Sequence, residues 1–233
     1  MRPLITLLLC CIAPALLAAP PERIEASYDL LSKGIRIAVV TEKFTRTGDH
    51  YRIESFTKPV GLLALFRSET YFVVSEGDIT AQGLRPKSFV YKRSKEVIKN
   101  SAANFDWQKS ILMYNDRDGH HSEPLPTGLQ DRLSMLYQFG YVPLLHERKE
   151  LSMHITNGSK IDNRQYLVRS KQVLTVPLGS LETLYLSTAP QQTPWKTEIW
   201  LAIEKGNLPC KIVLTEDNGE ILTQVLTALS INQ

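Results

Sequence analysis

Acidic residues and histidines lie closest together in the segment Asp116-Arg117-Asp118-Gly119-His120-His121. Imidazole and carboxylate groups at this spacing could bind a metal ion or transfer a proton. Adjacent residues of a β-strand point to opposite faces, however, so His120 and His121 would not share one ion. The segment also lacks the remaining ligand positions of a calcium loop. Because Asp and Gly are common turn residues, we expect a polar hairpin tip here.

Several common motifs of enzymes are missing from the sequence. It contains no Gly-x-Ser-x-Gly motif, no Gly-x-Gly-x-x-Gly motif and no phosphate loop. His50, His146 and His154 are isolated in the sequence. We therefore expect a protein that is not an enzyme, that acts by binding, and that needs no cofactor or metal ion.

Aromatic and apolar residues could instead form a surface for a ligand or a partner, since rings suit both sugar and protein contacts. The residues that we single out for such contacts are Phe66, Tyr91, Trp200, Leu222 and Leu226. Strand alternation turns some of these side chains inward, so membership of the core is the other interpretation.

A basic stretch runs from Arg85 to Lys99, and Glu96 is its one acidic residue. Its candidate contact residues are Arg85, Lys87, Lys92 and Arg93. In a cell envelope they could contact anionic lipid head groups, lipopolysaccharide or a cell-wall polymer. The alternative is an edge strand whose lysines prevent pairing with another sheet. A formal net charge of +3 is too small for a nucleic-acid-binding protein, so we expect no nucleic-acid partner.

The first eighteen residues have the layout of a cleavable signal peptide. A positive charge at Arg2 precedes an apolar run from Leu4 to Leu17, and small residues follow. The run is shorter than the roughly 20 apolar residues of a membrane span. We expect export to the periplasm, removal of residues 1–18, and a single β-rich, monomeric domain over residues 19–233. The mature chain would keep one cysteine, Cys210, which we expect to be buried.

Alternation of apolar and polar residues dominates the rest of the sequence, and this is the period of a β-strand. Alternating runs flank the turn Gly48-Asp49-His50, and others flank Asn218-Gly219, which is a strong hairpin signal. The pattern predicts a mainly β fold with a curved antiparallel sheet of half-barrel or barrel-like form.

One stretch departs from this alternation and has the spacing of a helix. It runs from Leu129 to Phe139, with Thr127 as the expected N-cap and Gln130 completing a capping box. We expect this to be the one substantial helix, packed against the sheet.

Several strands carry apolar residues on both faces. In the final run, Ile221 and Val225 share one face, while Leu222 and Leu226 occupy the other. A sheet with one wet face would alternate more regularly. Two interpretations stay open: the interior is the packed core of a closed β structure, or it holds an apolar cavity for an acyl chain or a similar ligand.

Three segments of strands and turns follow one another in the order found in a known family. They are Glu76–Pro86 leading into Phe89–Tyr91, Thr175–Thr183, and Thr197–Leu201 through Leu208–Pro209 with the Asn218-Gly219 hairpin. They resemble the bacterial exported family called domain of unknown function 3108 (DUF3108). The resemblance implies a periplasmic β-rich protein without established activity, and it assigns no functional residue. The expected fold is also similar to the lipoprotein-carrier half-barrels of the Gram-negative envelope, by analogy of fold only.

These features predict a non-enzymatic envelope protein that accommodates a lipid, an acyl chain or a polypeptide segment in an apolar concavity. Its partners would be a lipid or an envelope protein, with peripheral contact to a membrane or a cell-wall polymer. The first alternative is a scaffolding component of an envelope complex, docked through a strand edge and the basic stretch. The second is an enzyme acting on cell-wall or lipid substrates, which would depend on His120, His121 or His154.

Overall fold

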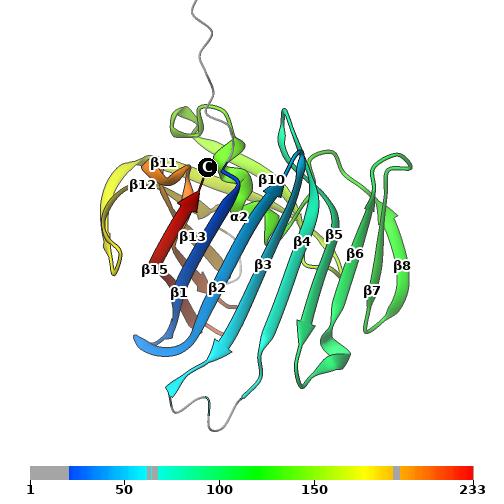
Figure 1. Cartoon of the computed structure of the whole chain (residues 1–233), viewed down its shortest axis with the longest axis horizontal. Coiled ribbons are helices and arrows are strands. Elements are labelled where there is room, and N and C mark those ends of the chain that lie inside the picture. Colours follow the sequence, from blue (N-terminus) through cyan, green and yellow to red (C-terminus); the bar gives the residue numbers. More distant parts are fainter. Residues whose placement is uncertain (1–20, 62–63, 65–67, 191–194, 233) are drawn as a thin grey trace, which may run out of the picture.

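The computed structural model describes residues 21–61, 64, 68–190 and 195–232. The strands in these ranges form one 15-stranded sheet, and the helical segments are short (Figure 1). The mainly β prediction is confirmed. Residues 1–20 lie outside the described residues, so the signal peptide and the domain boundary after it stay predictions.

The strands of the first half are β1 (Arg23–Ser32), β2 (Ile35–Thr47), β3 (His50–Pro59), β4 (Tyr71–Thr80), β5 (Gly83–Arg93), β6 (Ser101–Asp106), β7 (Ile111–Asp116) and β8 (Gly119–Pro124). Those of the second half are β9 (Gln130–Asp131), β10 (Glu150–Thr156), β11 (Ile161–Val176), β12 (Gly179–Thr188), β13 (Lys196–Ala202), β14 (Leu208–Thr215) and β15 (Ile221–Asn232). The helical segments are the α-helix α2 (Ser134–Gln138) and the 3₁₀ helices η1 (Val97–Lys99), η2 (Phe139–Tyr141), η3 (Leu145–Glu147) and η4 (Ile203–Lys205). No helix in the described ranges has both the length and the apolarity to cross a bilayer.

Strand order in the sheet follows chain order, from β8 through β1 and β15 to β9. The predicted turns at Gly48 and Gly219 are confirmed, because they join β2 to β3 and β14 to β15. Two pairs depart from the antiparallel meander. The strands β1 and β15 pair although they lie at opposite ends of the chain, with Arg23 opposite Asn232, and β9 runs parallel to β10. The first and last strands therefore lie side by side (Figure 1).

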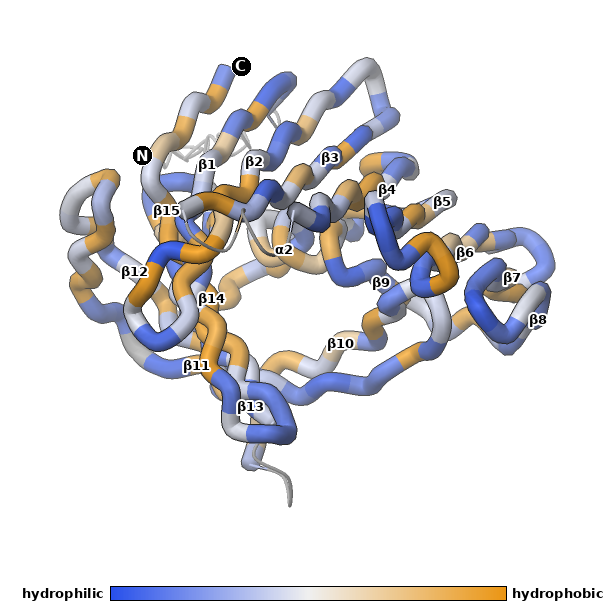
Figure 2. Tube along the Cα trace, turned by 90° about the horizontal axis from the view of Figure 1, so that it is seen from below, coloured by the Kyte–Doolittle hydropathy of each residue, from blue (hydrophilic) through white to orange (hydrophobic). Residues whose placement is uncertain are grey.

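The sheet rolls up, but its two edge strands do not pair with each other. Instead, the end of β10 and the turn after it pack against the inner face of β6 and β7. The Ser101 hydroxyl donates to the Asn157 carbonyl at 3.3 Å, and the Thr156 hydroxyl donates to Tyr114 Oη at 3.5 Å. Figure 2 shows the resulting roll, with α2 on its inner side and β6 to β8 extending beyond it. Side-chain contacts therefore hold an open sheet in a barrel-like form.

Inner-face side chains form the core of the roll. Strands of the first half, together with β14 and β15, make one apolar cluster with Tyr137 of α2, which includes the fully buried Ile53 and Phe89. Strands β10 to β13 make a second cluster with Met135 of α2 and Phe139 that follows it. Because α2 contributes to both clusters, it fills the part of the interior where the two halves of the sheet face each other.

Apolar residues on the outer face pack against their neighbours in the same sheet. The ring centroids of Trp200 and Tyr185 lie 4.9 Å apart, and the Lys211 ammonium lies 4.8 Å from the Trp200 centroid. Val225 is half-buried on the same face, opposite Lys211. Local packing of this kind accounts for the apolar residues that the sequence places on both faces.

The helix is shorter than the predicted Leu129 to Phe139, since α2 spans only Ser134–Gln138. Gln130 belongs to β9 and donates its side-chain N–H to the Leu84 carbonyl at 2.8 Å. The predicted capping box of Thr127 and Gln130 is therefore wrong. The backbone of Gln130 and Asp131 pairs with β10 instead of forming helical hydrogen bonds. This strand pairing overrides the helical spacing of the apolar residues.

Candidate functional site

A buried carboxyl group, Asp131, joins α2 to the sheet. Its Oδ1 accepts hydrogen bonds from the backbone N–H groups of Leu133 and Ser134, both at 2.8 Å. Its Oδ2 accepts from the Ser75 hydroxyl of β4 at 2.5 Å. Burial raises the pKa of Asp131, and these donors replace the water that the carboxyl group has lost. Together, these hydrogen bonds hold the start of α2 against β4.

A second buried carboxyl group, Glu42 of β2, faces α2 and is 6% exposed. The Tyr137 hydroxyl donates to its Oε2 at 3.2 Å. Burial raises the pKa of Glu42 to about 7, while hydrogen bonds from Tyr137 and Ser55 act in the opposite direction. The group lies among core side chains, so its shifted pKa affects the stability of the fold.

Glu42→Gln should change how the stability of the protein depends on pH. Between pH 4.5 and about 7, the unfolded chain loses the Glu42 proton while the folded protein keeps it, so stability falls as the pH rises. The glutamine variant lacks this loss and should be more stable than the wild type at pH 8, by up to roughly 3 kcal/mol. Urea unfolding at several pH values measures the difference, and a difference that does not change with pH would contradict the assignment.

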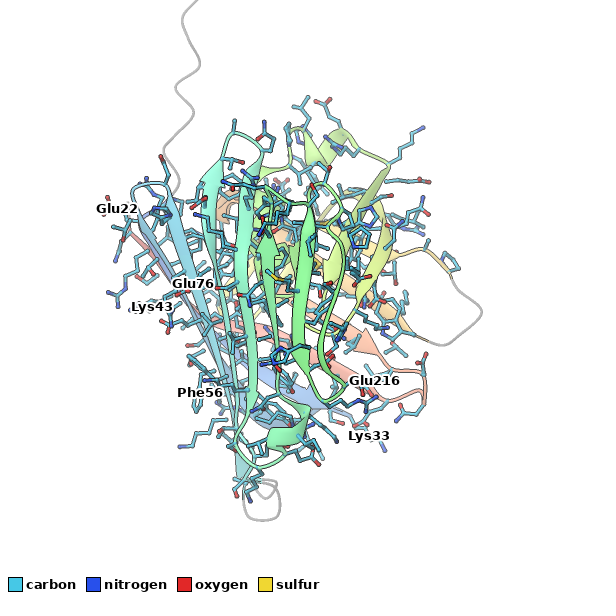
Figure 3. The ribbon with its side chains drawn as sticks, turned by 90° about the vertical axis from the view of Figure 1, so that its right-hand side faces the viewer. Glu22, Lys33, Lys43, Phe56, Glu76 and Glu216 are labelled. Carbon is cyan, nitrogen blue, oxygen red and sulfur yellow. The ribbon has the colours of Figure 1, made fainter. Side chains whose placement is uncertain are left out.

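Below α2, the inner face of β1, β14 and β15 becomes partly exposed. Beside the helix, Tyr28, Cys210 and Leu226 are at most 2% exposed. Further toward the end of the roll where Lys33 and Glu216 lie (Figure 3), apolar inner-face side chains are only half-buried. We call this set the lower apolar wall; its members are Leu30, Ile212, Leu214 and Leu222.

On the inner face of β4 and β5, cationic and aromatic side chains form one continuous stack. The Arg132 guanidinium lies 4.2 Å from the centroid of the Tyr91 ring. The Tyr91 ring lies 6.2 Å from that of Tyr71 at an interplanar angle of 13°, and the Arg93 guanidinium lies 5.3 Å beyond Tyr71. We call these four side chains the Arg–Tyr stack. They share the face of the buried Phe89, so the stack faces the interior of the roll.

Part of the predicted binding set lies on the inner face of the sheet, at two separate places. Tyr91 and Arg93 belong to the Arg–Tyr stack, and Leu222 belongs to the lower apolar wall. Sequence reasoning missed Arg132, which follows β9 and reaches Tyr91 on a strand far away in sequence. The one available signal was a cation at Arg132 inside the helix-like stretch, three residues after Leu129 and next to Leu133.

The other predicted apolar residues lie elsewhere. Leu226 is 0% exposed, so it packs in the core. Trp200 lies on the outer face between Tyr185 and Lys211. Phe66 lies outside the described residues, and its role stays a prediction.

The basic stretch does not form one surface. Strand β5 lies between β4 and β6, so its interpretation as an edge strand is wrong. Arg85 and Lys92 are exposed on the outer face, and the Lys87 ammonium pairs with Asp78 at 2.7 Å. Arg93 points to the opposite face, into the Arg–Tyr stack. The cations are therefore divided between the two sides of the sheet.

The outer face also carries hollows lined by mixed polar and apolar residues. One of about 500 Å³ lies beside Arg85, Asp106 and Trp107, and another of about 430 Å³ lies beside Lys92 and Ile98. Figure 3 shows Lys43, Phe56 and Glu76 projecting from the outer side of the sheet. The lining of the second hollow includes Tyr91 of the Arg–Tyr stack, whereas no member of the stack lines the first.

The predicted hairpin tip at residues 116–121 is confirmed as the turn between β7 and β8. His121 Nδ1 lies 3.9 Å from Asp116 Oδ1, and the His121 ring lies 4.7 Å from that of Tyr114. His120, the residue before it, points to the other face of the strand, opposite Asn115. Within the described ranges, no group of three or more His, Cys, Asp or Glu residues could hold a metal ion.

Two possible nucleophiles in the described chain are held in the core. Ser55 and Lys58 form a Ser-x-x-Lys sequence in β3, but Ser55 is buried inward and Lys58 is exposed outward. Cys210 is fully buried and its thiol donates to the Trp200 carbonyl at 3.4 Å. Burial raises the pKa of Cys210 to about 11, so the thiol stays protonated. The prediction of a buried cysteine is confirmed.

Comparison with solved structures finds the same type of fold. The crystal structure of a β-barrel-like protein of domain of unknown function DUF1849 from Brucella abortus matches with a TM-score of 0.60 and 10% identity, over 92% of this chain and 100% of that chain. A lipoprotein candidate from Parabacteroides distasonis gives a TM-score of 0.35 and 8% identity, over 91% of this chain and 97% of that one. The first match supports a barrel-like fold and carries no information on function. None of the curated proteins matches the chain.

The family model described as protein of unknown function DUF3108 matches residues 24–227. This range contains the Arg–Tyr stack, the lower apolar wall and both buried carboxyl groups. It also contains the three segments whose resemblance to the family was noted in the sequence. The chain belongs to the DUF3108 family.

Proposed function

We propose that this chain is a non-enzymatic binding protein of the cell envelope that holds an acyl chain against the lower apolar wall. The export expected from residues 1–18 would place it in the periplasm as a monomer. An acyl chain suits this surface because the four members of the wall are aliphatic, so binding would remove apolar area from water; the polar Gln224 lies among them, opposite Leu30 and Ile212.

One observation carries the proposal, the change of burial along the inner face. Tyr28 and Leu226 are sealed by the core, whereas Leu30 and Leu222 on the same strands remain partly exposed. Such inward-facing apolar residues would ordinarily be covered in a fully packed barrel. An apolar ligand would cover them.

The buried acids of the interior support binding rather than catalysis. Asp131 is engaged by three donors, and Glu42 is covered by α2 and bonded to Tyr137. A general acid or base must come within hydrogen-bond reach of its substrate. These two groups instead hold the helix against the sheet.

The proposal predicts that an uncharged apolar dye binds the inner face. N-phenyl-1-naphthylamine should give a saturable fluorescence increase with the purified protein, and monooleoylglycerol should displace it. Leu222→Asn should weaken dye binding by about tenfold, since it removes apolar contact area and adds an amide to the wall.

The matched control is Ile221→Asn, one residue away on the same strand. Ile221 points to the outer face and is 49% exposed, so its replacement should leave the dissociation constant unchanged within about twofold. Thermal unfolding of both variants checks that they are folded. No saturable binding by the wild type, or equal weakening by both replacements, would refute the proposal.

A further inference from the structure

We infer that the Arg132 guanidinium binds the oxyanion head group of a single-chain lipid whose acyl chain lies on the lower apolar wall. This inference rests on the proposed function and adds the chemical class of the ligand. Its basis is an inward-facing arginine that is stacked on aromatic rings and has no acidic partner among the described residues.

The stack holds Arg132 in place through the flat faces of its neighbours. The guanidinium lies 4.2 Å from the Tyr91 centroid and 5.8 Å from that of Phe89. Attraction between a cation and the face of a ring fixes the plane of the guanidinium and leaves its N–H groups directed outward in that plane. These donors match the geometry of a phosphate or a carboxylate.

Charge pairing distinguishes Arg132 from the other inward-facing arginine of the stack. Arg93 is bonded to the carboxylates of Glu69 and Glu96. The nearest acid in sequence to Arg132 is Asp131, whose two carboxylate oxygens already accept bonds from Ser75 and from backbone N–H groups. In the described part of the chain, no Asp or Glu oxygen lies within 4.0 Å of the Arg132 guanidinium.

The surroundings of Arg132 also indicate a ligand rather than bulk water as its partner. The side chain is exposed, yet the surrounding protein desolvates the guanidinium and lowers its pKa. A cation in such surroundings gains from an anion brought by a ligand, because their attraction is less screened there than in water. The lower apolar wall lies on the inner face of the same sheet, so one ligand with an anionic head and an apolar chain matches both features.

Two lipids with the same oleoyl chain test the inference. Oleoyl lysophosphatidate carries a phosphate head, and monooleoylglycerol is uncharged. Each lipid is added below its critical micelle concentration, and the displacement of bound N-phenyl-1-naphthylamine gives its affinity. We expect the wild type to bind the phosphate lipid at least about tenfold more tightly, as for a hydrogen-bonded charge pair. Arg132→Gln should reduce this preference to near unity, with the affinity for monooleoylglycerol unchanged within about twofold.

Arg85→Gln is the matched control, because Arg85 is also an exposed arginine stacked on an aromatic ring. Its guanidinium lies 5.0 Å from the Trp107 centroid, but on the outer face. This replacement should leave the preference for the phosphate lipid intact. Loss of the preference in both variants would indicate a general effect of net charge and would overturn the inference.

The outcomes separate the inference from the proposed function. Equal binding of the two lipids by the wild type would refute the role of Arg132 while supporting the acyl-chain site. Failure of both lipids to displace the dye would refute the acyl-chain site itself, and the inference with it. If inorganic phosphate competes with the phosphate lipid at equal concentration, the anion site serves free phosphate, and the lipid source is wrong.

Discussion

Asp131→Ala should lower the free energy of unfolding by about 3–5 kcal/mol, the loss typical of a broken buried network. The replacement removes the acceptor of the Ser75 hydroxyl and of the Leu133 and Ser134 N–H groups. These donors would stay buried without partners, including the first backbone N–H group of α2 at Ser134. Urea unfolding followed by circular dichroism measures the change.

Asp131→Asn is the matched control, since it keeps the shape of the side chain. Its carbonyl oxygen can still accept from the two backbone N–H groups, and its amide can donate to the Ser75 hydroxyl. We expect this variant to lose only about 1 kcal/mol. Equal losses in the two variants would show that the charge of Asp131, and not its hydrogen-bond geometry, stabilises the junction.

Gly77→Ala should destabilise the protein by at least about 3 kcal/mol, at the upper end of overpacking effects. Gly77 lies opposite Pro86 at a β-bulge between β4 and β5. A Cβ atom there would lie 2.2 Å from the Arg85 carbonyl oxygen and 2.8 Å from Pro86 Cα. Because these are backbone atoms, no side-chain rotation relieves the overlap. A lowered midpoint of thermal unfolding is the expected measurement.

Gly219→Ala separates this steric effect from the ordinary cost of replacing a glycine. Gly219 has a φ of +80°, but nothing lies within 4 Å of an added Cβ. Strain of the left-handed conformation alone should cost about 1–2 kcal/mol. If Gly77→Ala cost no more than Gly219→Ala, the two strands would have to separate easily at the bulge.

Most of the sheet could be predicted from the sequence because its strands pair with their neighbours in the chain. The turns at Gly48 and Gly219 show this, since alternation and turn residues are local signals. The helix over Leu129 to Phe139 was predicted too long because its first residues pair with β10 and bond to Leu84, contacts that spacing does not encode. The part of the DUF3108 resemblance around Gly77 has a physical basis in the bulge, where a side chain does not fit.

The candidate site was predicted only in part, since its residues come from distant segments. Tyr91 was singled out as an aromatic residue and Arg93 as part of the basic stretch; they share a face because they are two residues apart on one strand. Arg132 was missed because its contact with Tyr91 depends on how β9 packs inside the roll. The same limit applies to Trp200, whose orientation toward the outer face follows from the register with Lys211 and Tyr185.

The pairing of β1 with β15 affects how cooperatively the two halves of the sheet fold. Every other pair of neighbouring strands in the sheet is also consecutive in the chain, and all of these pairs except the parallel β9 and β10 are hairpins that can form early and independently. The bonds between Arg23–Ser32 and Leu222–Asn232 close a loop that spans nearly the whole chain, at an entropic cost that grows only slowly with loop length. This one strand pair joins two meanders into a single cooperative unit. A chain without β15 would keep its other hairpins but lose the cooperative unfolding of the two halves.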